Sequence, residues 1–265
     1  MTPVSKVCVY IPSFNYGEFL QEAIESVLRQ TLGRWELILV DEGSTDRTAD
    51  IIALYQGDPR IRNFRTEKIG LPSVANFAIE QSRSEYLMRL DADDVLDENA
   101  LLVLSDYLDR NTESVLVFPD YYLMDERGFV YAQERRQEIF YRNHVFDFPP
   151  NGACTLFRKS LLEEVGGYRC DLGAQDGFDI WTRVKDKYKW GNVTLPLFYY
   201  RRHGQNLTDR TNTILSARRR IKMDSVVDIA KESKPIIAVI LCRKNYDFQP
   251  NLWGGKIGSE TLLGR

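Results

Sequence analysis

The sequence contains little of what marks several specialised classes of protein. Its 265 residues include four cysteines, Cys8, Cys154, Cys170 and Cys242. They are too far apart for a paired zinc site and too few for a secreted disulfide scaffold, so we interpret them as free thiols of a reducing compartment. A formal net charge of -3 gives no support to a general nucleic-acid binder. No apolar run reaches the length of a transmembrane helix.

Other absences narrow the choice further. The first apolar segment, residues 4–12, is too short for a signal peptide and leads directly into a patterned domain. We therefore expect a cytoplasmic protein, either soluble or associated with the cytoplasmic face of a membrane. The turns between the expected elements carry neither a dinucleotide fingerprint nor a phosphate-binding loop. This argues against a Rossmann dehydrogenase and against a P-loop enzyme.

An apolar strand that ends in three carboxylates is the central feature of the chain. Residues 85–90 alternate in the manner of a strand, and Asp91, Asp93 and Asp94 follow at once. Repulsion among these carboxylates would raise their pKa values unless a cation lies between them, and a divalent metal is the candidate. The alternative is that Asp93, Asp94 or Asp97 simply caps the next helix.

Strand and helix patterns alternate along most of the chain. Strands are expected at residues 7–12, 35–40, 60–65, 86–90, 115–118, 153–157 and 193–200, and helices at 17–30, 46–54, 72–82, 97–110, 159–165, 175–184 and 211–233. This order predicts an α/β fold with a mainly parallel central sheet flanked by helices and right-handed crossovers. Ligands of such sheets bind beyond the carboxyl ends of the strands, which places the Pro12 loop, Asp41 and residues 91–94 on one rim. A hairpin at residues 121–131 opens a smaller, mixed region.

Four motifs, taken in order and with their spacing, identify a family resemblance. They are IPSFN at residues 11–15, DEGSTD at 41–46, DADD at 91–94 and QDGFDIW at 175–181. Residues 4–208 resemble the family 2 glycosyltransferases, which have the GT-A nucleotide-sugar fold.

The resemblance implies roles for particular residues. The donor nucleotide site would comprise Pro12, Ser13, Asn15, Asp41, Asp91 and Ala92. Asp41 would recognise the base, and Asp91 would face the ribose and a metal-bound water. Asp93 would ligate Mg²⁺ or Mn²⁺ together with His203, although a lone histidine is more often structural. Asp176 would be the general base, and it could equally serve as the N-cap of its own helix.

The chemistry of sugar transfer is consistent with these roles. A departing nucleoside diphosphate needs an electropositive clamp, and an attacking hydroxyl needs a carboxylate to take its proton. We expect an inverting, metal-dependent glycosyltransferase that moves a sugar from a nucleoside-diphosphate sugar, UDP being favoured, to a hydroxyl of a glycan or glycolipid in cell-surface polysaccharide biosynthesis. The alternatives are a sugar-1-phosphate nucleotidyltransferase and a non-catalytic nucleotide-sugar-binding scaffold. Glu42, Ala75 and Gln175 depart from the usual pattern of the family.

The carboxyl-terminal part is expected to be an appendage. The division is a GT-A domain at residues 1–208, with a nucleotide-binding part at 1–119 and an acceptor-side part at 120–208, and an appendage at 209–265. The basic helix at 211–233 could lie on an anionic membrane that holds a lipid-linked acceptor, or dock with its basic face in solvent. Residues 235–265 resemble, over a short stretch, the opening of a cytidylyltransferase-type domain. The alternative is a tail that pairs with a sheet edge or with a second subunit of a homo-oligomer.

Overall fold

The computed structural model describes residues 5–136, 150, 152–172, 176–204, 206 and 211–232. The chain divides into two compact units, Met1–Ser225 and Val226–Arg265, and the account below concerns the first. The expected strand and cytidylyltransferase-like opening after residue 234 lie outside the described residues. The division of the glycosyltransferase domain at residues 119 and 208 stays a prediction.

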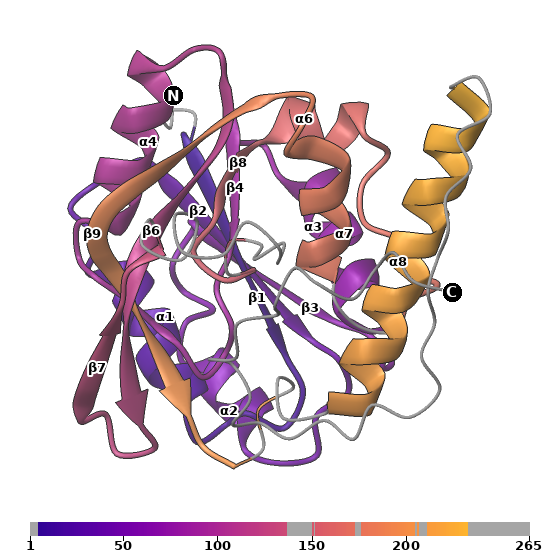
Figure 1. Cartoon of the computed structure of the whole chain (residues 1–265). Helices are drawn as coiled ribbons and strands as arrows, with labels where there is room; N and C mark the ends of the chain where they lie inside the picture. Colours follow the sequence, from indigo (N-terminus) through magenta and orange to yellow (C-terminus); the bar gives the residue numbers. More distant parts are fainter. Residues whose placement is uncertain are drawn as a thin grey trace. The chain divides into compact units, whose positions relative to one another are not determined.

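The order of elements follows the alternation expected from the sequence (Figure 1). The strands are β1 (Val7–Ser13), β2 (Trp35–Asp41), β3 (Ile61–Arg65), β4 (Tyr86–Arg89), β5 (Val95–Leu96), β6 (Ser114–Asp125), β7 (Val130–Glu134), β8 (Leu156–Arg158) and β9 (Lys189–Arg202). The helices are α1 (Leu20–Leu28), α2 (Thr48–Ala53), α3 (Leu71–Gln81), α4 (Ala100–Arg110), α6 (Lys159–Glu164), α7 (Asp176–Val184) and α8 (Thr211–Glu232).

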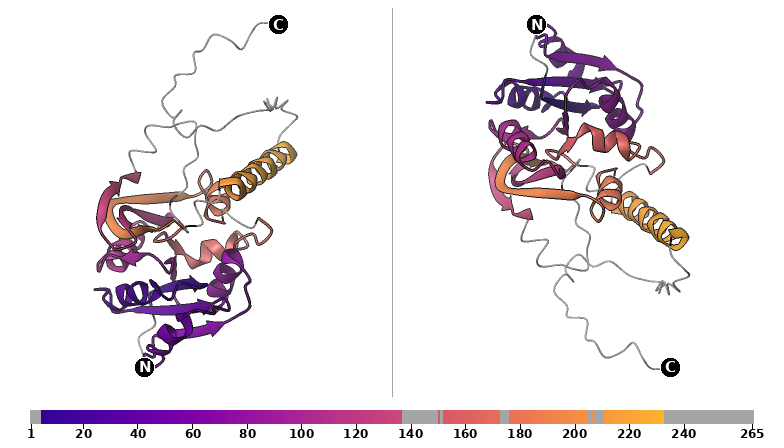
Figure 2. Two further views of the ribbon diagram at one scale, coloured as in Figure 1. Left: turned by 90° about the horizontal axis from the view of Figure 1, so that it is seen from below. Right: turned by 90° about the horizontal axis from the view of Figure 1, so that it is seen from above.

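The described strands form one nine-stranded sheet with a parallel half and a mixed half. Strands β3, β2, β1 and β4 lie side by side and are all parallel, as the βαβ pattern predicts. Strand β8 then pairs antiparallel with both β4 and β6. Strand β9 follows β6 in parallel along most of its length, and both views in Figure 2 show the long orange strand beside its partner. The α/β fold with a smaller mixed region is confirmed.

Alternating side chains of the parallel strands build two apolar layers. Val9 and Leu37 belong to a cluster that includes buried residues of α1, α2 and α4, whereas Tyr10 and Ile38 belong to a cluster with α3, α6 and α7. Because successive side chains of a strand point to opposite faces, these clusters lie on the two faces of the sheet. The sheet is therefore covered on both sides, and its polar strand ends are what remains for a ligand.

Two strands differ from the expected bounds for backbone reasons. Strand β6 does not end before Pro119 but continues through it, with a register shift against β9 between Pro119 and Asp120. A bulge tolerates a residue that has no N–H to donate, so the proline does not end the strand. Strand β8 begins at Leu156 rather than at residue 153, because Cys154 has a positive φ of 57° that an extended strand cannot contain.

The first half of α8 is docked on the rest of its unit. Ala217 and Ile221 are buried, and Ile221 packs with Leu172 and Phe178. Among the described helices, none is both long enough and apolar enough to cross a membrane.

Candidate functional site

Three neighbouring parallel strands end at the same edge of the sheet. Ser13, the last residue of β1, is the register partner of Asp41, the last residue of β2. On the other side of β1, Tyr10 pairs with Arg89 of β4, and the Leu90 N–H donates to the Tyr10 carbonyl oxygen at 3.0 Å. The loops after β1, β2 and β4 thus leave the sheet side by side, as expected from the sequence.

The loops after β1 and β2 are joined by hydrogen bonds around Asp41. The Ser44 N–H donates to Asp41 Oδ1 at 2.8 Å, and Arg65 Nη1 lies 3.1 Å from Asp41 Oδ2. Asn15 donates its N–H to Ser44 Oγ at 2.8 Å and accepts the Thr45 N–H on Oδ1 at 2.8 Å. Asp41 and Asn15 are therefore held in one orientation at the position expected for the nucleotide base.

Three further residues expected in the donor site, Pro12, Ser13 and Ala92, are buried. Pro12 lies within β1, and Ala92 belongs to the apolar cluster on the α1 side of the sheet. The Ser13 side chain is also buried, and its Oγ has no hydrogen-bond partner among the described residues. A buried hydroxyl without a partner is costly unless a ligand or water satisfies it. Of these three residues, only Ser13 leaves a side-chain polar group available at the strand end.

Asp93 and His203 face each other across the site. His203 Nε2 lies 2.7 Å from Asp93 Oδ2, and both side chains are buried. Tyr16 and Phe19, which lie just before α1 in the chain, contact the imidazole. The centroid of the His203 ring is 6.0 Å from that of Tyr16 and 5.1 Å from that of Phe19. Asn206 accepts the His203 N–H on Oδ1 at 2.9 Å. The pair expected from the sequence is thus brought together from segments 110 residues apart.

None of the three candidate aspartates caps α4, whose N-cap residue is Asn99 and which has no side-chain capping hydrogen bond. Asp97 Oδ1 accepts the Asn99 N–H at 2.9 Å at the start of that helix. Asp94 instead points inward, where its Oδ1 accepts the Arg201 N–H at 2.9 Å. Asp97 thus stabilises the turn that leads into α4, and the helix-capping alternative does not account for Asp93 or Asp94.

The three carboxylates of the β4 loop are not equivalent. Arg89 Nε lies 2.9 Å from Asp91 Oδ1 and supplies a positive charge there. Asp94 is completely buried, and burial raises its pKa well above the ordinary value, with the charges of Asp93 and Asp91 adding to the effect. Burial and the same carboxylates also raise the pKa of the Tyr16 hydroxyl. Burial is the main cause of the raised pKa of Asp94, and the repulsion expected from the sequence adds to it.

The chemistry of the Asp93–His203 pair is suited to a divalent cation. Within the described part of the chain, no group of three or more histidine, cysteine, aspartate or glutamate side chains is arranged to hold a metal. Mg²⁺ and related ions, however, commonly take only one or two protein ligands and complete their shell with substrate phosphates and water. Carboxylate oxygen and imidazole nitrogen both suit Mn²⁺. Asp93 and His203 therefore fit as a two-ligand site that a diphosphate would complete.

Asp176 is the first residue of α7, and its side chain lies outside the described part of the structure, as does Gln175. The start of the helix is nevertheless located. A Cβ built on Gly177 would lie 3.6 Å from the Cα of Gly152, and one built on Gly152 would collide with the guanidinium of Arg89. Arg89 forms an ion pair with Asp91. The amino end of α7 therefore lies near residues 91–94, which we call the carboxylate loop. The role of Asp176 stays a prediction.

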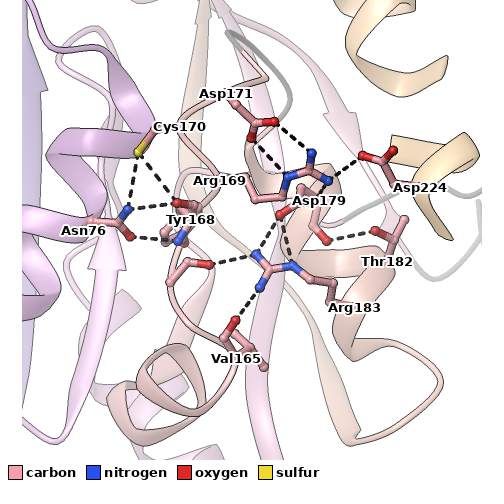
Figure 3. A network of polar contacts seen from close by, with 11 residues as sticks. Asn76, Val165, Tyr168, Arg169, Cys170, Asp171, Asp179, Thr182, Arg183 and Asp224 are labelled. Carbon is pink, nitrogen blue, oxygen red and sulfur yellow. Dashed lines mark hydrogen bonds and ion pairs between the residues drawn. The ribbon is translucent and has the colours of Figure 1, made fainter. Parts of the chain in front are cut away.

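A second polar network holds α7 in place (Figure 3). Asp179 is buried and accepts from Arg183 Nη2 at 2.6 Å, and Arg183 also donates to the Val165 carbonyl oxygen at 2.7 Å. Arg169 binds Asp171 on its own segment and Asp224 on α8. The network ties α7, the segment before it and α8 together.

Several residues at the site were not expected from the sequence. Arg65 and Arg89 each bind one of the aspartates at the strand ends, and Arg201 and Asn206 contact the Asp93–His203 pair. The last two lie within three positions of His203, which is the one signal that could have found them. Ala75, one of the departures from the family pattern, is fully buried in the apolar cluster that includes α3.

Fold and site together define the class of the protein. The first half of the sheet is an open parallel α/β sheet of order β3-β2-β1-β4, and the aspartates and the histidine lie at its carboxyl edge, where ligands of such sheets bind.

Comparison with known proteins assigns the family. The model of glycosyl transferase family 2 matches residues 8–166, and the chain belongs to this family. A chondroitin synthase of Escherichia coli is 23% identical over 204 residues, which is 77% of this chain and 30% of that protein. The chain spans about a third of the length of the curated relatives it matches first.

Solved structures share the fold. Staphylococcus aureus TarS 1–349 in complex with UDP-GlcNAc has a TM-score of 0.62 and 18% identity, covering 75% of this chain and 59% of that one. The mannosyltransferase PcManGT of Pyrobaculum calidifontis, in complex with GDP-Man and Mn²⁺, has a TM-score of 0.57 and 21% identity, covering 75% and 57%.

Proposed function

We propose that the chain transfers a sugar from a nucleoside-diphosphate sugar to a hydroxyl group of a glycan or glycolipid, with inversion at the anomeric carbon. The observation that carries the proposal is the facing pair of Asp93 and His203, 2.7 Å apart, at the edge where β1, β2 and β4 end. That edge is where nucleotides bind in open α/β sheets.

The donor would lie between the two groups of polar side chains at this edge. Asp41 and Asn15, fixed by the Ser44 and Thr45 contacts, would face the base. Ser13 would offer its unpartnered hydroxyl to the ribose or a phosphate. UDP is the favoured nucleotide, in line with the UDP-GlcNAc complex of TarS.

Asp93 and His203 would hold Mg²⁺ or Mn²⁺ against the diphosphate. The bound ion would neutralise the negative charge that develops on the leaving diphosphate. Asp93 contributes a carboxylate that neutralises part of the charge of the ion, and Asn206 orients the His203 backbone so that Nε2 points at Asp93. The Mn²⁺ complex of PcManGT favours this use of the site.

Asp176 would take the proton of the acceptor hydroxyl as that oxygen attacks the anomeric carbon. Its place at the amino end of α7 puts it on the element that Gly177, Gly152 and Arg89 bring against the carboxylate loop. A carboxylate is stabilised as an anion near a helix amino terminus. One displacement by the acceptor oxygen inverts the configuration of the transferred sugar. The chondroitin synthase relative favours a polysaccharide acceptor.

The proposal is tested by separating donor binding from transfer. UDP-, GDP-, CDP- and dTDP-sugars would be incubated with Mn²⁺ and a set of oligosaccharide and glycolipid acceptors, and the product linkage read by NMR. We expect one nucleotide class to give a product of inverted configuration. In Asp176→Asn, kcat should fall about 10²- to 10⁴-fold, the usual range for loss of a general base, with donor affinity unchanged.

Asp97→Asn is the matched control, because Asp97 lies four residues after Asp93 and its carboxylate accepts the Asn99 N–H in the turn before α4. It should keep transfer close to wild type. A product of retained configuration, or transfer at wild-type rate in Asp176→Asn, would contradict the mechanism. Donor binding without transfer to any acceptor would favour a non-catalytic scaffold.

A further inference from the structure

Arg201 is a buried cation directly behind the Asp93–His203 pair. It is 2% exposed and is the largest fully buried side chain in the described structure. Its Nε donates to the Asp93 carbonyl oxygen at 2.9 Å, and its Nη1 donates to the Glu126 carbonyl oxygen at 3.1 Å. Its Nη2 pairs with the Glu22 carboxylate of α1. A buried guanidinium is costly unless such partners surround it, so its position is closely determined.

The contacts of Arg201 join the two segments that carry the pair. Its side chain holds the backbone of Asp93, and its own N–H donates to the Asp94 carboxylate at 2.9 Å. His203 lies two residues after Arg201, directly after the end of β9. The loop that bears Asp93 and the strand end that leads to His203 are therefore connected through one residue.

Asn206 completes the connection on the histidine side. Its Nδ2 donates to the Arg201 carbonyl oxygen at 2.9 Å and lies 3.5 Å from Asp93 Oδ2, while its Oδ1 accepts the His203 N–H at 2.9 Å. The backbone around His203 is thus held from both ends of a short segment. The backbones of Asp93 and His203 are therefore both held by hydrogen bonds that pass through Arg201 and Asn206.

We infer that Arg201 is a positioning residue that sets the separation of Asp93 Oδ2 and His203 Nε2 for a divalent cation bound with the donor diphosphate. The inference rests on the proposed function. It adds that metal affinity depends on a side chain that touches neither metal nor substrate. Two donors held in place in advance bind an ion more tightly than two that must first be ordered, and loss of such an outer partner typically weakens metal binding 10- to 100-fold.

The geometry of the guanidinium, rather than its charge, should matter. The three nitrogens of Arg201 reach the Asp93 carbonyl, the Glu126 carbonyl and the Glu22 carboxylate in one plane. A lysine ammonium keeps the charge but cannot reproduce this planar fork. Arg201→Lys is therefore the informative substitution.

Arg62→Lys is the matched control. Arg62 on β3 donates through Nη2 to Glu36 Oε2 on β2 and to the carbonyl oxygen of Gln81 at the end of α3, each at 2.8 Å. The Arg62→Lys variant loses an arginine–carboxylate contact similar to that of Arg201, but this contact does not involve Asp93 or His203.

The experiment is a Mn²⁺ titration of the whole protein at saturating UDP, with free Mn²⁺ read by its EPR signal. Arg201→Lys should weaken Mn²⁺ binding about 10- to 100-fold, and excess Mn²⁺ should restore much of its transfer rate. Arg62→Lys should bind Mn²⁺ like wild type. Wild-type Mn²⁺ affinity in Arg201→Lys, or an equal loss in Arg62→Lys, would overturn the inference.

Glu22→Gln keeps the inference testable where Arg201→Lys does not fold. Glu22 is half exposed and anchors Nη2 of Arg201, so its amide variant should weaken Mn²⁺ binding in the same direction by a smaller factor. Wild-type affinity in Glu22→Gln would then overturn the role of Arg201. Wild-type protein that binds no Mn²⁺ with any nucleoside diphosphate would overturn the proposed function, and the inference with it.

Discussion

Two arginine-centred networks stabilise the two sides of the site, and they differ in burial. Arg201, behind Asp93, has a side chain only 2% exposed, whereas Arg169 and Arg220, which connect α8 to its neighbours, are 30% and 54% exposed. The hydrogen bonds are of similar length in both. Solvent screens the pairs of the second network, whereas in the first it reaches only the Glu22 end of the Arg201 contacts, so contacts of similar length should have unequal effects on stability.

The two networks stabilise their parts of the fold to different degrees. On the donor side, the buried network around Arg201 holds the backbone segments that carry Asp93 and His203. On the side of α7 and α8, exposed pairs such as Arg220–Asp171 tie segments together without fixing them tightly. Asp179 lies between these extremes, since it is buried and pairs with half-exposed Arg183.

The largest effect on stability is expected for Arg201→Met. The substitution leaves the Asp93 and Glu126 carbonyl oxygens without their donor and removes the cation that faces Glu22. Hydrogen bonds from a charged donor contribute about 1.5 to 3 kcal/mol each, so the loss of these contacts should cost about 3 kcal/mol or more. Urea denaturation should show it as a lower midpoint with an unchanged m-value. A loss as small as that of an exposed pair would remove the distinction between the two networks.

Asp179→Asn should have an intermediate effect. It weakens the charge-assisted bonds from Arg183, which themselves hold the Val165 and Gly167 carbonyl oxygens, at a cost of about 2 kcal/mol. Because Asp179 lies one turn from the start of α7, we also expect kcat to fall while donor affinity stays the same. Steady-state kinetics with donor titration checks this. If Asp179→Asn changed donor affinity and left kcat unchanged, α7 would belong to the donor site, which contradicts its proposed role in transfer.

The pH dependence of stability should have opposite signs in the two networks. Burial raises the pKa of Asp94, so the folded state binds more protons than the unfolded state above the ordinary carboxyl pKa. Its contribution to stability therefore falls as pH rises from that ordinary value toward the folded pKa. Hydrogen bonds from Arg169 lower the pKa of Asp171, so its contribution is present above the ordinary value and is lost as pH falls toward the folded pKa.

Two amide variants isolate these contributions. The difference in unfolding free energy between wild type and Asp94→Asn, measured on metal-free protein, should decrease with rising pH. The difference between wild type and Asp171→Asn should increase with rising pH. Slopes of the same sign would contradict the contrast in burial.

The smallest effect is expected for Arg220→Ala. Its pair with Asp171 is exposed on both sides, and such pairs contribute about 0 to 1 kcal/mol. The melting temperature should change little at low salt and not at all at high salt. A large loss would show that α8 contributes more to the unit than its contacts indicate.

How far the sequence predicts this molecule depends on the range of the interactions. The parallel half of the sheet follows from local patterns, because strands β1, β2 and β4 and their helices each carry their own periodicity. The end of β6 was predicted wrongly at Pro119, because the bulge that accommodates this proline depends on the register with β9. Cys154 misled because its positive φ belongs to a loop whose conformation no local pattern reveals.

The site divides in the same way. Asp93 is recognisable because carboxylates at a strand end form a local motif, and His203 through its resemblance to family members. Arg201 is one of 35 lysine and arginine residues, and it is buried only because α1, the turn between β6 and β7 and the carboxylate loop pack around it. Asp176 was predicted from the family motif alone, and its role remains to be tested.

The most direct test of the central claim is a thermal-unfolding measurement with UDP, with and without Mn²⁺, on wild type, Asp93→Asn and Asp171→Asn. At about a hundredfold excess over the dissociation constant, binding to the folded state adds about 2.7 kcal/mol of stability. We predict that UDP with Mn²⁺ stabilises wild type and Asp171→Asn, and that Asp93→Asn loses the Mn²⁺-dependent part. Equal Mn²⁺-dependent stabilisation of Asp93→Asn would contradict the assignment of Asp93 and His203 as the site of the divalent cation.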